Sequence, residues 1–567
     1  MWSNYKEQLL PLSKKKKEPN ENNIYQFYIE LENKKCDMIM LSVNGHLCEF
    51  EFQHNYNSWR SCTPLELFDL PVIKKYTEKN KLTKIQIEKE VKDCDGLIIW
   101  TDSDKQGENI GYEIINLCKA VKPNIKVYRA HFLEITNESI NNAIHSLKHP
   151  QENKSKAIDV LREIDLRIGA VFTRFQTLHF QKRFPQQIKD KVTYGNIQYP
   201  IIGFIVNKYL EIGKFEIQKY WKIILYHEND EFHHIQNDFF QVKQCQKYFN
   251  IIKESKQYAI VENIIENNIY KSRPTPLNTV ELLKLSSKYL NLNSDTTMKI
   301  AQQLYVIGLI SYPRTDTNSF SSDFDFKKLL ISYQSKNIIY SQMAKKNYEN
   351  NIIKPNNGTK FDYTHTPIYP TSCVTYGALI NLPVLELHVY DLIIRHFFAC
   401  ILKDAHAIEK IISVNIGGEK FIIKKFILIK KNFLSVYEKF DDWIIDSETF
   451  NKYKIGQKFK PTKIDLIEKQ TLPPSLLNEV QLLDLMNEHG IGTKKTYANS
   501  MQKVIDNNYA KFKNNKYFIP TKLGLGIVQA YKTINLTNFK TPKLQKDINK
   551  YIIYICQGIK TPEQVLK

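Results

Sequence analysis

The sequence lacks paired cysteines, long apolar runs and a secretory leader. Its 9 cysteines are scattered singly over 567 residues, with no C-x-x-C pair and no Cys/His cluster of zinc-ligand spacing. This distribution indicates a reducing compartment and argues against a structural zinc site. No apolar run of about eighteen residues occurs, so no membrane-spanning helix is expected. The first residues, MWSNYKEQLLPLSKKKKEPNENN, do not have the pattern of a signal peptide.

The sequence also has fewer acids than bases. Lys and Arg number 80 against 60 Asp and Glu, which leaves a formal net charge of +20. This balance favours a polyanionic partner, with nucleic acid ahead of an anionic membrane surface. Codon bias is an equally good explanation, because the chain is also rich in Asn, Ile and Tyr. A length of 567 residues, of which 42% are hydrophobic, predicts three or four folded domains.

The N-terminal quarter has the pattern of an α/β domain. GLIIWT (96–101) is a short apolar run typical of a buried parallel strand, GENIGYEIINLCKAV has helical spacing, and KVYRAHF predicts the next strand. This order predicts an α/β domain that ends near residue 135. Helical patterns follow at 137–212, 276–332, 384–404 and 475–567, and strand patterns at 215–272 and 406–465. Residues 334–362 are rich in Asn and Lys and predict a loose surface insertion.

Two aspartates and a glutamate follow the predicted strand directly. In TDSDKQGE (101–108), Asp102 and Asp104 lie two residues apart, and Glu108 stands at the start of the next helix. Carboxylates at the carboxyl end of a parallel strand face the crevice where such sheets bind ligands, and two of them can share a hard cation such as Mg²⁺. Helix capping by Asp104 is the competing interpretation, because acids favour helix N-termini.

A tyrosine beside a proline and an arginine marks a second segment of interest. GLISYPRTDTNSF (308–320) places Tyr312 directly before Pro-Arg-Thr-Asp-Thr, just beyond the helical pattern TTMKIAQQLYVIGL. Tyr312 can be a packed aromatic at a turn, or a nucleophile held beside a phosphate-binding cation. The residues of this segment alone leave both interpretations open.

Eight segments, in one collinear order, resemble motifs of the type IA DNA topoisomerases, and most closely the eukaryotic topoisomerase III branch. LIIWTDSDKQGENIGYEI is similar to the Toprim signature of that family, whose usual form contains D-x-D-R-E-G-E. The other matching segments are SVNGHL (42–47), LREIDLRIGAVFTRFQT (161–177), TYGNIQYPIIGF (193–204), RPTPLNTVEL (273–282), ISYPRTDT (310–317), HTPIYPT (365–371) and LMNEHGIGTKKT (485–496). Together they extend over most of the chain.

The resemblance implies a multidomain α/β plus α protein with a toroidal fold, made of an N-terminal Toprim domain, a helical base and a strand-rich arch. Mapped on this sequence, it predicts a Toprim-like metal-binding domain at 1–135, a helical DNA-binding base at 150–214 and 470–567, a strand-rich arch at 215–272 and 376–469, and a domain carrying the catalytic tyrosine at 273–375.

Tyr312 is the nucleophile that the resemblance implies. Tyrosine has a pKa near 10, so only about a thousandth is phenolate at neutral pH, and a cation or base is needed nearby. Arg314 can hold the phosphate with its planar guanidinium and offset developing charge. His365 matches a histidine that the family places against the phosphate. The resemblance further implies that Asp102, Asp104 and Glu108 bind Mg²⁺.

Four further residues match positions that the family directs at the DNA strand. Arg162, Asp165 and Arg167 fall on one helix-like segment, and Gln198 matches a polar position of the next motif. Positions 162 and 165 share a helix face, so an ion pair between them is the competing interpretation.

Two departures from the family pattern concern the metal site. Gln106 stands where the family has glutamate, and Lys105 where it has arginine. A neutral amide is a weaker ligand, so we expect a lower affinity for Mg²⁺. The A-E-K-x-x-x-A-K strand with which family members begin has no match in this sequence, and Glu7 is a poor substitute. We therefore expect that activity is impaired.

The expected function is an ATP-independent DNA topoisomerase that breaks one strand through a 5′-phosphotyrosine link, passes a strand and religates. No P-loop G-x-x-x-x-G-K-[ST] is present, which agrees with independence from ATP. The expected substrates are single-stranded or underwound DNA and recombination intermediates. A RecQ-family helicase and an oligonucleotide-binding-fold protein are the expected partners, and the nucleus, ahead of mitochondria, is the expected location. The alternative is a degenerate clamp of the same fold that binds single strands without cleaving them.

Overall fold

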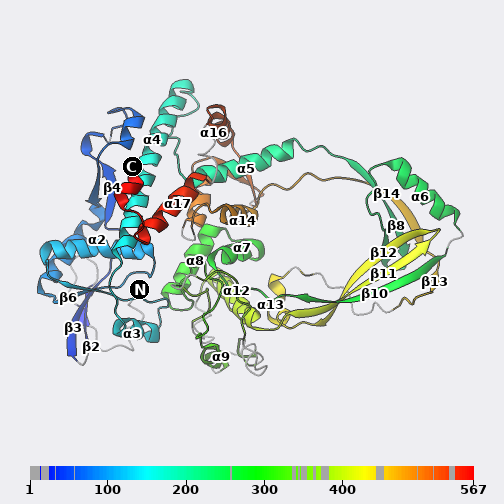
Figure 1. Ribbon diagram of the computed structural model, residues 1–567, viewed down its shortest axis with the longest axis horizontal. Coiled ribbons are helices and arrows are strands. Elements are labelled where there is room, and N and C mark those ends of the chain that lie inside the picture. Colours follow the sequence, from blue (N-terminus) through cyan, green and yellow to red (C-terminus); the bar gives the residue numbers. More distant parts are fainter. Residues whose placement is uncertain are drawn as a thin grey trace.

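The computed structural model of the chain, shown in Figure 1, has a Toprim-like part at one end and a curled sheet at the other, with helices between them. It describes residues 13–14, 24–31, 34–56, 58–255, 258–334, 340–342, 345, 354–361, 365–371, 382–441, 443, 452–493, 496–514, 516–535 and 543–567. Among these residues, no helix combines the length and the apolar character that a bilayer crossing requires.

The N-terminal part contains the predicted strand, acidic loop, helix and strand. β6 (Gly96–Ile99) and β7 (Lys126–Arg129) pair in parallel, and α2 (Lys105–Val121) connects them. The other elements of this part are β1 (Ser13–Lys14), β2 (Ile24–Leu31), β3 (Lys34–Leu41), β4 (Cys48–Phe52), β5 (Val72–Tyr76), α1 (Lys81–Glu90) and α3 (Asn137–His145), with the short 3₁₀ helices η2 (His54–Tyr56), η3 (Pro64–Phe68), η4 (Glu78–Asn80) and η5 (Val91–Asp93). The acidic loop thus lies at the carboxyl end of β6, where parallel sheets bind ligands.

The helical base is built on α4 (Glu152–Arg183), which packs against α2 on one side and α17 on the other. Its other elements are α5 (Gln198–Gly213), α14 (Glu479–His489), α15 (Tyr497–Asp506), β15 (Ala510–Lys513), β16 (Tyr517–Pro520), α16 (Lys522–Thr533), α17 (Lys543–Cys556) and α18 (Pro562–Leu566). The β15–β16 hairpin interrupts a stretch that the sequence predicts to be helical. Phe512 and Phe518 face each other across the hairpin, with 4.7 Å between ring centroids, and both pack onto the core of the base. This cross-strand aromatic pair stabilises the hairpin.

The part that carries Tyr312 is helical and has its own core. It contains α7 (Thr279–Tyr289), α8 (Ser294–Val306), α9 (Phe326–Gln334), α12 (Val384–Ile401), α13 (Leu434–Tyr437) and the 3₁₀ helix η6 (Glu438–Phe440). The sequence-based arch range 376–469 includes α12, but this helix buries most of its side chains in the core around Tyr312. Helix α12 therefore belongs with the Tyr312 part rather than with the sheet, because most of its apolar side chains fill this helical core.

The arch is one antiparallel sheet in the order β13-β10-β11-β12-β9-β8-β14. Its elements are β8 (Lys219–His227), β9 (Asp230–His234), α6 (Val242–Glu254), β10 (Ala259–Lys271), β11 (Ala405–Ile416), β12 (Glu419–Lys430), β13 (Lys458–Phe459) and β14 (Lys463–Gln470). Helix α6 is absent from the sequence-based prediction of strands at 215–272. The β11–β12 hairpin turns through Gly417 and Gly418, whose φ angles of 63° and 85° suit a two-residue turn that favours glycine.

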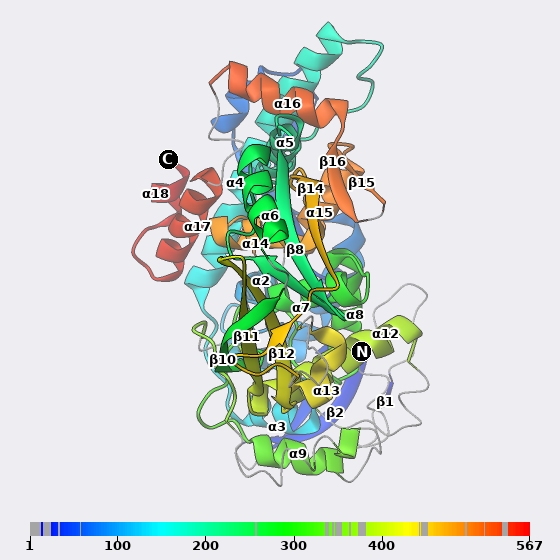
Figure 2. The same ribbon diagram turned by 90° about the vertical axis from the view of Figure 1, so that its right-hand side faces the viewer.

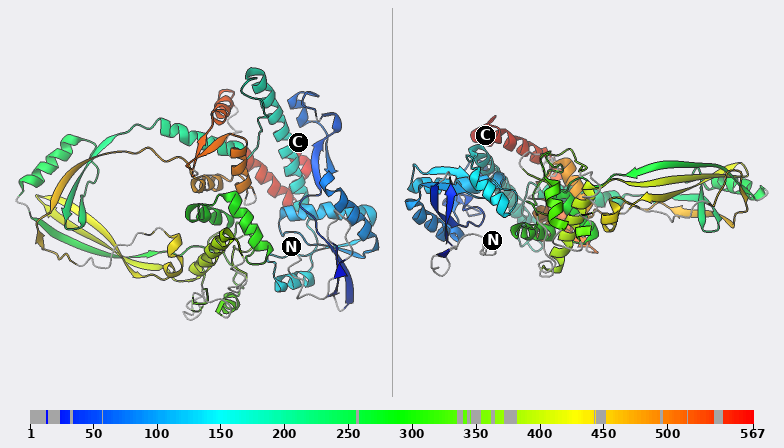
Figure 3. Two further views of the ribbon diagram at one scale, coloured as in Figure 1. Left: turned by 180° about the vertical axis from the view of Figure 1, so that it is seen from behind. Right: turned by 90° about the horizontal axis from the view of Figure 1, so that it is seen from below.

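Two arms join this sheet to the helices, and the ribbon has a ring-shaped outline (Figures 1 and 3). One arm runs from α5 into β8 and returns from β14, and the other consists of the long strands β10, β11 and β12. Viewed along the long axis, the arch lies in front of the helices (Figure 2). The predicted toroidal architecture is confirmed. The Tyr312 part lies between the arch and the Toprim-like part.

Candidate active site

Tyr312 is both a packed aromatic and a neighbour of the acidic loop. Its side chain is 4% exposed, and its ring lies edge-on to that of Tyr305, with 5.3 Å between centroids. The Tyr312 hydroxyl donates a hydrogen bond of 2.7 Å to Oδ2 of Asp104, which is 208 residues away in sequence. Both interpretations that the sequence leaves open therefore apply to Tyr312. Its ring is packed in the core, and its hydroxyl is bonded to an acid of the loop.

The two carboxylate oxygens of Asp104 have different hydrogen-bond partners. It is the N-cap of α2, where Oδ1 accepts a hydrogen bond of 2.9 Å from the Gly107 amide. This confirms the capping interpretation, but Oδ2 remains directed at Tyr312. The turn is tight enough to require glycine at 107, since a Cβ there would lie 1.9 Å from the Asp102 carbonyl oxygen. Helix capping thus aims the carboxylate at the tyrosine.

Both aspartates act electrostatically on the same tyrosine hydroxyl. Burial, followed by the charges of Asp104 and Asp102, raises the pKa of Tyr312 well above its ordinary value, while Arg314 acts in the opposite direction. The same two carboxylates contribute to a raised pKa for Tyr305. Two carboxylates in one loop are sufficient protein ligands for Mg²⁺, which keeps several waters. Asp102 and Asp104 therefore fit a divalent cation.

Glu108, the third predicted metal ligand, is bonded to other protein groups in this structure. Its side chain is 2% exposed, forms a 3.0 Å ion pair with Nε of Arg129, and accepts a 3.2 Å hydrogen bond from the Gln151 amide. Arg129 is fully buried and donates through Nη2 to the Asp102 carbonyl oxygen at 2.7 Å. Among the described residues, no cluster of three or more His, Cys, Asp or Glu side chains could hold a metal ion. Glu108 therefore orients the arginine that holds the acidic loop.

The other two predicted catalytic residues lie close to Tyr312. The His365 ring stacks against the Tyr312 ring, with 5.8 Å between centroids and 22° between planes. Arg314 donates through Nη1 to the Gln302 side chain on α8, and its charge acts on Tyr312. The structure thus brings together Tyr312, Arg314 and His365 with Asp102 and Asp104.

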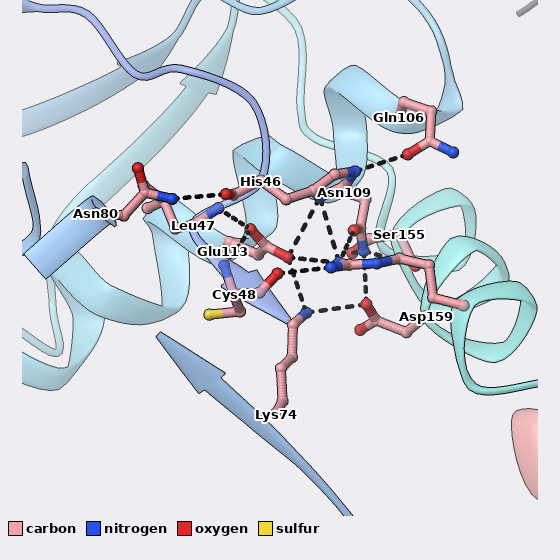
Figure 4. A network of polar contacts seen from close by, with 11 residues as sticks. His46, Leu47, Cys48, Lys74, Asn80, Gln106, Asn109, Glu113, Ser155 and Asp159 are labelled. Carbon is pink, nitrogen blue, oxygen red and sulfur yellow. Dashed lines mark hydrogen bonds and ion pairs between the residues drawn. The ribbon is translucent and has the colours of Figure 1, made fainter. Parts of the chain in front are cut away.

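Gln106 contacts a histidine of the SVNGHL segment. Its Oε1 lies 2.8 Å from Nε2 of His46, and Figure 4 shows the two side chains pointing toward each other. Positions 106, 109 and 113 share one face of α2, and that face also carries Asn109 and Glu113 toward His46. The residue that departs from the family pattern therefore belongs to a polar network at the start of α2.

The centre of this network is Glu113, which motif matching does not single out. Its carboxylate accepts hydrogen bonds from the Leu47 amide (2.7 Å) and from Arg162 (2.9 Å), and pairs with Lys74 (3.4 Å). Burial alone would raise the pKa of Glu113, but the hydrogen bond from His46 and the charges of Lys74, His46 and Arg162 lower it to about 2. The signal in the sequence is the helical spacing from Gln106 to Glu113.

Two of the residues predicted to contact DNA fasten the base to the N-terminal part. Arg162 donates to Glu113 and to the Cys48 carbonyl oxygen, and its guanidinium lies over the Phe50 ring at 5.1 Å. Arg167 pairs with Glu163 at 2.6 Å and donates to carbonyl oxygens of the η3 segment. Contact of these two arginines with a DNA strand stays a prediction, and in this structure protein groups use their donors.

The other two predicted DNA contacts, Asp165 and Gln198, are bonded to residues of the base itself. Asp165 is exposed on α4 and accepts a 3.0 Å hydrogen bond from Asn196, not from Arg162, so the predicted i,i+3 ion pair does not form. Gln198, at the start of α5, accepts a 2.9 Å hydrogen bond from Asn507. Glu7 lies outside the described residues, and of the first 23 residues the structure describes Ser13 and Lys14 alone.

An aromatic pocket beside α4 is a further feature that motif matching misses. It has a volume of about 230 Å³ and is open to solvent. Its lining residues are Phe50, Glu51, Phe52, Trp59, Leu166, Ala170, Thr173 and Arg174. Aromatic rings beside a cationic residue are the usual platform for unpaired nucleic-acid bases.

Comparison with known proteins gives consistent matches. Residues 149–567 match the family model described as DNA topoisomerase, and residues 25–135 match the Toprim domain. The chain is 39% identical over 551 residues to DNA topoisomerase 3-alpha of Drosophila melanogaster, covering 96% of this chain and 43% of the relative. Identity to the Homo sapiens 3-alpha protein is 37%, covering 96% and 54%. The chain thus spans about half the length of these curated relatives.

A shorter relative and a solved structure extend these matches. DNA topoisomerase 3 of Schizosaccharomyces pombe is 31% identical over 533 residues, which cover 92% of this chain and 85% of the relative. The structure of full-length topoisomerase I from Thermotoga maritima superposes with a TM-score of 0.72 at 19% identity, over 92% of this chain and 83% of that one. At this identity the superposition supports the fold alone.

Proposed function

Because the chain belongs to the type IA DNA topoisomerase family, we propose that it changes DNA topology by breaking and rejoining one strand through Tyr312. The observation that carries the proposal is the 2.7 Å hydrogen bond from the Tyr312 hydroxyl to Asp104, which joins the tyrosine of one motif to the acidic loop of another. Both parts of a cleavage site are therefore assembled on one side of the Tyr312 domain.

The chemistry requires no external energy. The Tyr312 oxygen attacks a backbone phosphorus, a tyrosine ester with the 5′-phosphate forms, and the 3′-oxygen leaves and takes up a proton. The reverse reaction restores the strand, so the phosphodiester energy is kept. Oδ2 of Asp104 is placed to receive the phenolic proton, and Arg314 and His365 to hold the phosphate. Asp102 and Asp104 would hold Mg²⁺, which supplies positive charge beside the phosphate.

We propose single-stranded or underwound DNA as the substrate. The net charge of +20 suits a polyanion, and the open pocket beside Trp59 offers an aromatic ring on which an unpaired base can stack. The proposed further roles, which rest on the likeness to topoisomerase 3 proteins, are resolution of recombination intermediates with a RecQ-family helicase and an oligonucleotide-binding-fold partner, in the nucleus.

Relaxation of a negatively supercoiled plasmid tests the proposed function. We expect relaxation with Mg²⁺ and without ATP, and its loss when EDTA removes the metal. Binding of single strands without any relaxation, over a range of temperatures that melt the plasmid locally, would contradict the proposal and favour a non-cleaving clamp.

We expect single-strand binding to weaken steeply with salt. Lys and Arg that neutralise phosphates release counterions, so the logarithm of affinity falls linearly with the logarithm of salt concentration, by roughly 0.7 per phosphate contact. A Tyr312→Phe protein, which binds without cleaving, and a fluorescent strand would give the slope by anisotropy. An affinity that does not change between low and high salt would contradict contact with the backbone.

Gln106→Glu tests whether the departure from the family pattern weakens metal binding. The side chain at 106 faces His46, so we expect the Mg²⁺ concentration for half-maximal relaxation to change by less than about threefold. Asp102→Asn is the matched control, with a large increase expected. A tenfold lower Mg²⁺ requirement in Gln106→Glu would show that this side chain reaches the metal.

A further inference from the structure

The loop after β7 is bonded to both halves of the proposed cleavage site. The Ser103 hydroxyl, between the two aspartates, donates to the Phe132 carbonyl oxygen at 2.9 Å and accepts from the Phe132 amide at 3.1 Å. One residue further on, the Leu133 carbonyl oxygen accepts a hydrogen bond of 3.0 Å from the Tyr312 amide. Residues 132–134 therefore connect the acidic loop with the backbone of the tyrosine.

Glu134 adds a side-chain bond across the same boundary. Its half-buried carboxylate accepts a hydrogen bond from the hydroxyl of Tyr369, which is 4% exposed in the core around Tyr312. Burial, the Glu134 charge and this hydrogen bond raise the pKa of Tyr369 far above its ordinary value, so the phenol remains a donor at neutral pH. A hydrogen bond to an ionised carboxylate is charge-assisted, which makes it stronger than a bond between neutral groups.

Tyr369 is in turn fastened to the residue before the nucleophile. The Tyr369 amide donates to the Ser311 hydroxyl at 3.0 Å, and the Ser311 amide donates to the Tyr369 carbonyl oxygen at 3.0 Å. Glu134 is therefore connected to Tyr312 through Tyr369 and the neighbouring residue Ser311. The ion pair between Lys328 and Glu138 crosses nearby, but both side chains are exposed, and such pairs contribute little.

We propose that Glu134 and Tyr369 form a clasp that keeps the Tyr312 segment seated on the acidic loop, and that they are positioning residues for strand cleavage and rejoining. The clasp influences how often the two halves of the site separate, because this part-buried, charge-assisted side-chain bond links Tyr369 and Ser311 to the loop at 132–134. The inference rests on the proposed function for its role in rejoining, but the clasp itself is independent of activity.

Hydrogen exchange of the free protein tests the clasp without any DNA. In Tyr369→Phe, the ring stays and one hydroxyl is lost, so we expect protection to fall by about tenfold in peptides covering 308–317 and 130–136. Tyr437→Phe is the matched control, since it removes a buried hydroxyl that bonds to His396 at 2.9 Å in the same core but on the far side from the acidic loop. In Tyr437→Phe, the protection of both peptides should equal that in the unmodified protein.

A double-mutant cycle identifies the partner. Glu134→Ala should reproduce the loss seen in Tyr369→Phe, the double variant should add nothing further, and Glu134→Gln, which keeps an acceptor oxygen, should lose less. Unchanged protection in Tyr369→Phe would overturn the clasp. Equal loss across α7, α8 and α12 would also overturn it, because Tyr369 would then only stabilise its own core.

Rejoining supplies a second readout. If the clasp holds the site closed, Tyr369→Phe should rejoin a cleaved strand several-fold more slowly than Tyr437→Phe, with unchanged affinity for the strand. Altered exchange together with no cleavage by the unmodified protein would leave the clasp standing and contradict the proposed function. Altered exchange with an unchanged rejoining rate would contradict the positioning role.

Discussion

Tyr312→Phe is expected to abolish the covalent protein–DNA adduct and plasmid relaxation. The substitution removes the oxygen that attacks phosphorus in the proposed reaction. The ring should remain packed against Tyr305 and His365, and Asp104 keeps its hydrogen bond with Gly107. Loss of one hydrogen bond in a buried pair costs about 1–3 kcal/mol. The fold should therefore survive while activity falls to background.

Covalent trapping measures this result directly. A single strand labelled at its 3′ end is mixed with protein and Mg²⁺, the mixture is denatured rapidly, and the protein is separated on a gel. The label stays with the protein because the tyrosine holds the 5′-phosphate of the labelled fragment. We expect a labelled band from the unmodified chain and none from Tyr312→Phe.

The control must show that the variant still binds. Tyr312→Phe should retain salt-sensitive binding of the same strand, and Tyr437→Phe should retain the labelled band. A band that persists in Tyr312→Phe would mean that another residue is the nucleophile. If neither protein gives a band while both bind, the chain is a clamp that does not cleave.

Glu113→Gln is expected to cause the largest loss of stability. The carboxylate is 1% exposed and neutralises Lys74 and Arg162 while it accepts bonds from the Leu47 and Cys48 amides. Removing one partner of a buried charged network leaves the others uncompensated, which costs about 3–5 kcal/mol. The loss should be local to the contact between α2, α4 and β4, so exchange of the Leu47 and Cys48 amides is the appropriate measurement.

The pH dependence of this effect has a definite sign. The pKa of Glu113 is lowered from 4.5 to about 2, so the folded state favours the charged form. Its contribution, roughly 3 kcal/mol, is present above pH 4.5 and is lost as the pH falls toward 2. Protection of the Leu47 amide should decline over that window in the unmodified chain and stay flat in Glu113→Gln.

Glu88→Gln is a suitable control for the same domain. Glu88 pairs with Lys84 at 2.8 Å on α1, and both side chains are about one-third exposed. Exposed i,i+4 pairs contribute less than about 0.5 kcal/mol, so the exchange pattern should be nearly unchanged. A similar loss in both variants would show that Glu113 acts only as a surface charge.

The sequence by itself was sufficient for the family and for singling out two residues, Tyr312 and Asp104, that the structure brings together. Eight motifs in one order predict the toroidal fold, and the strand–loop–helix pattern places Asp104 at a helix start. Tyr312 and Asp104 could be singled out because the residues next to them in the sequence indicate their roles. Asp104 follows a strand and caps a helix, and Tyr312 stands before Pro-Arg. Periodicity and caps are local properties, and a sequence displays them directly.

Only the tertiary structure showed which of the predicted carboxylates and arginines are already bonded to other protein groups. Glu108 lies one turn beyond Asp104, as a metal ligand could, yet Arg129 of β7 occupies it. Arg162 matches a DNA-contacting position, yet Glu113 and the Cys48 carbonyl oxygen use its donors. The bond between Tyr369 and Glu134 joins residues 235 positions apart. Such pairings depend on which faces of distant elements meet, and that is determined only when burial of the separate cores sets the elements against one another.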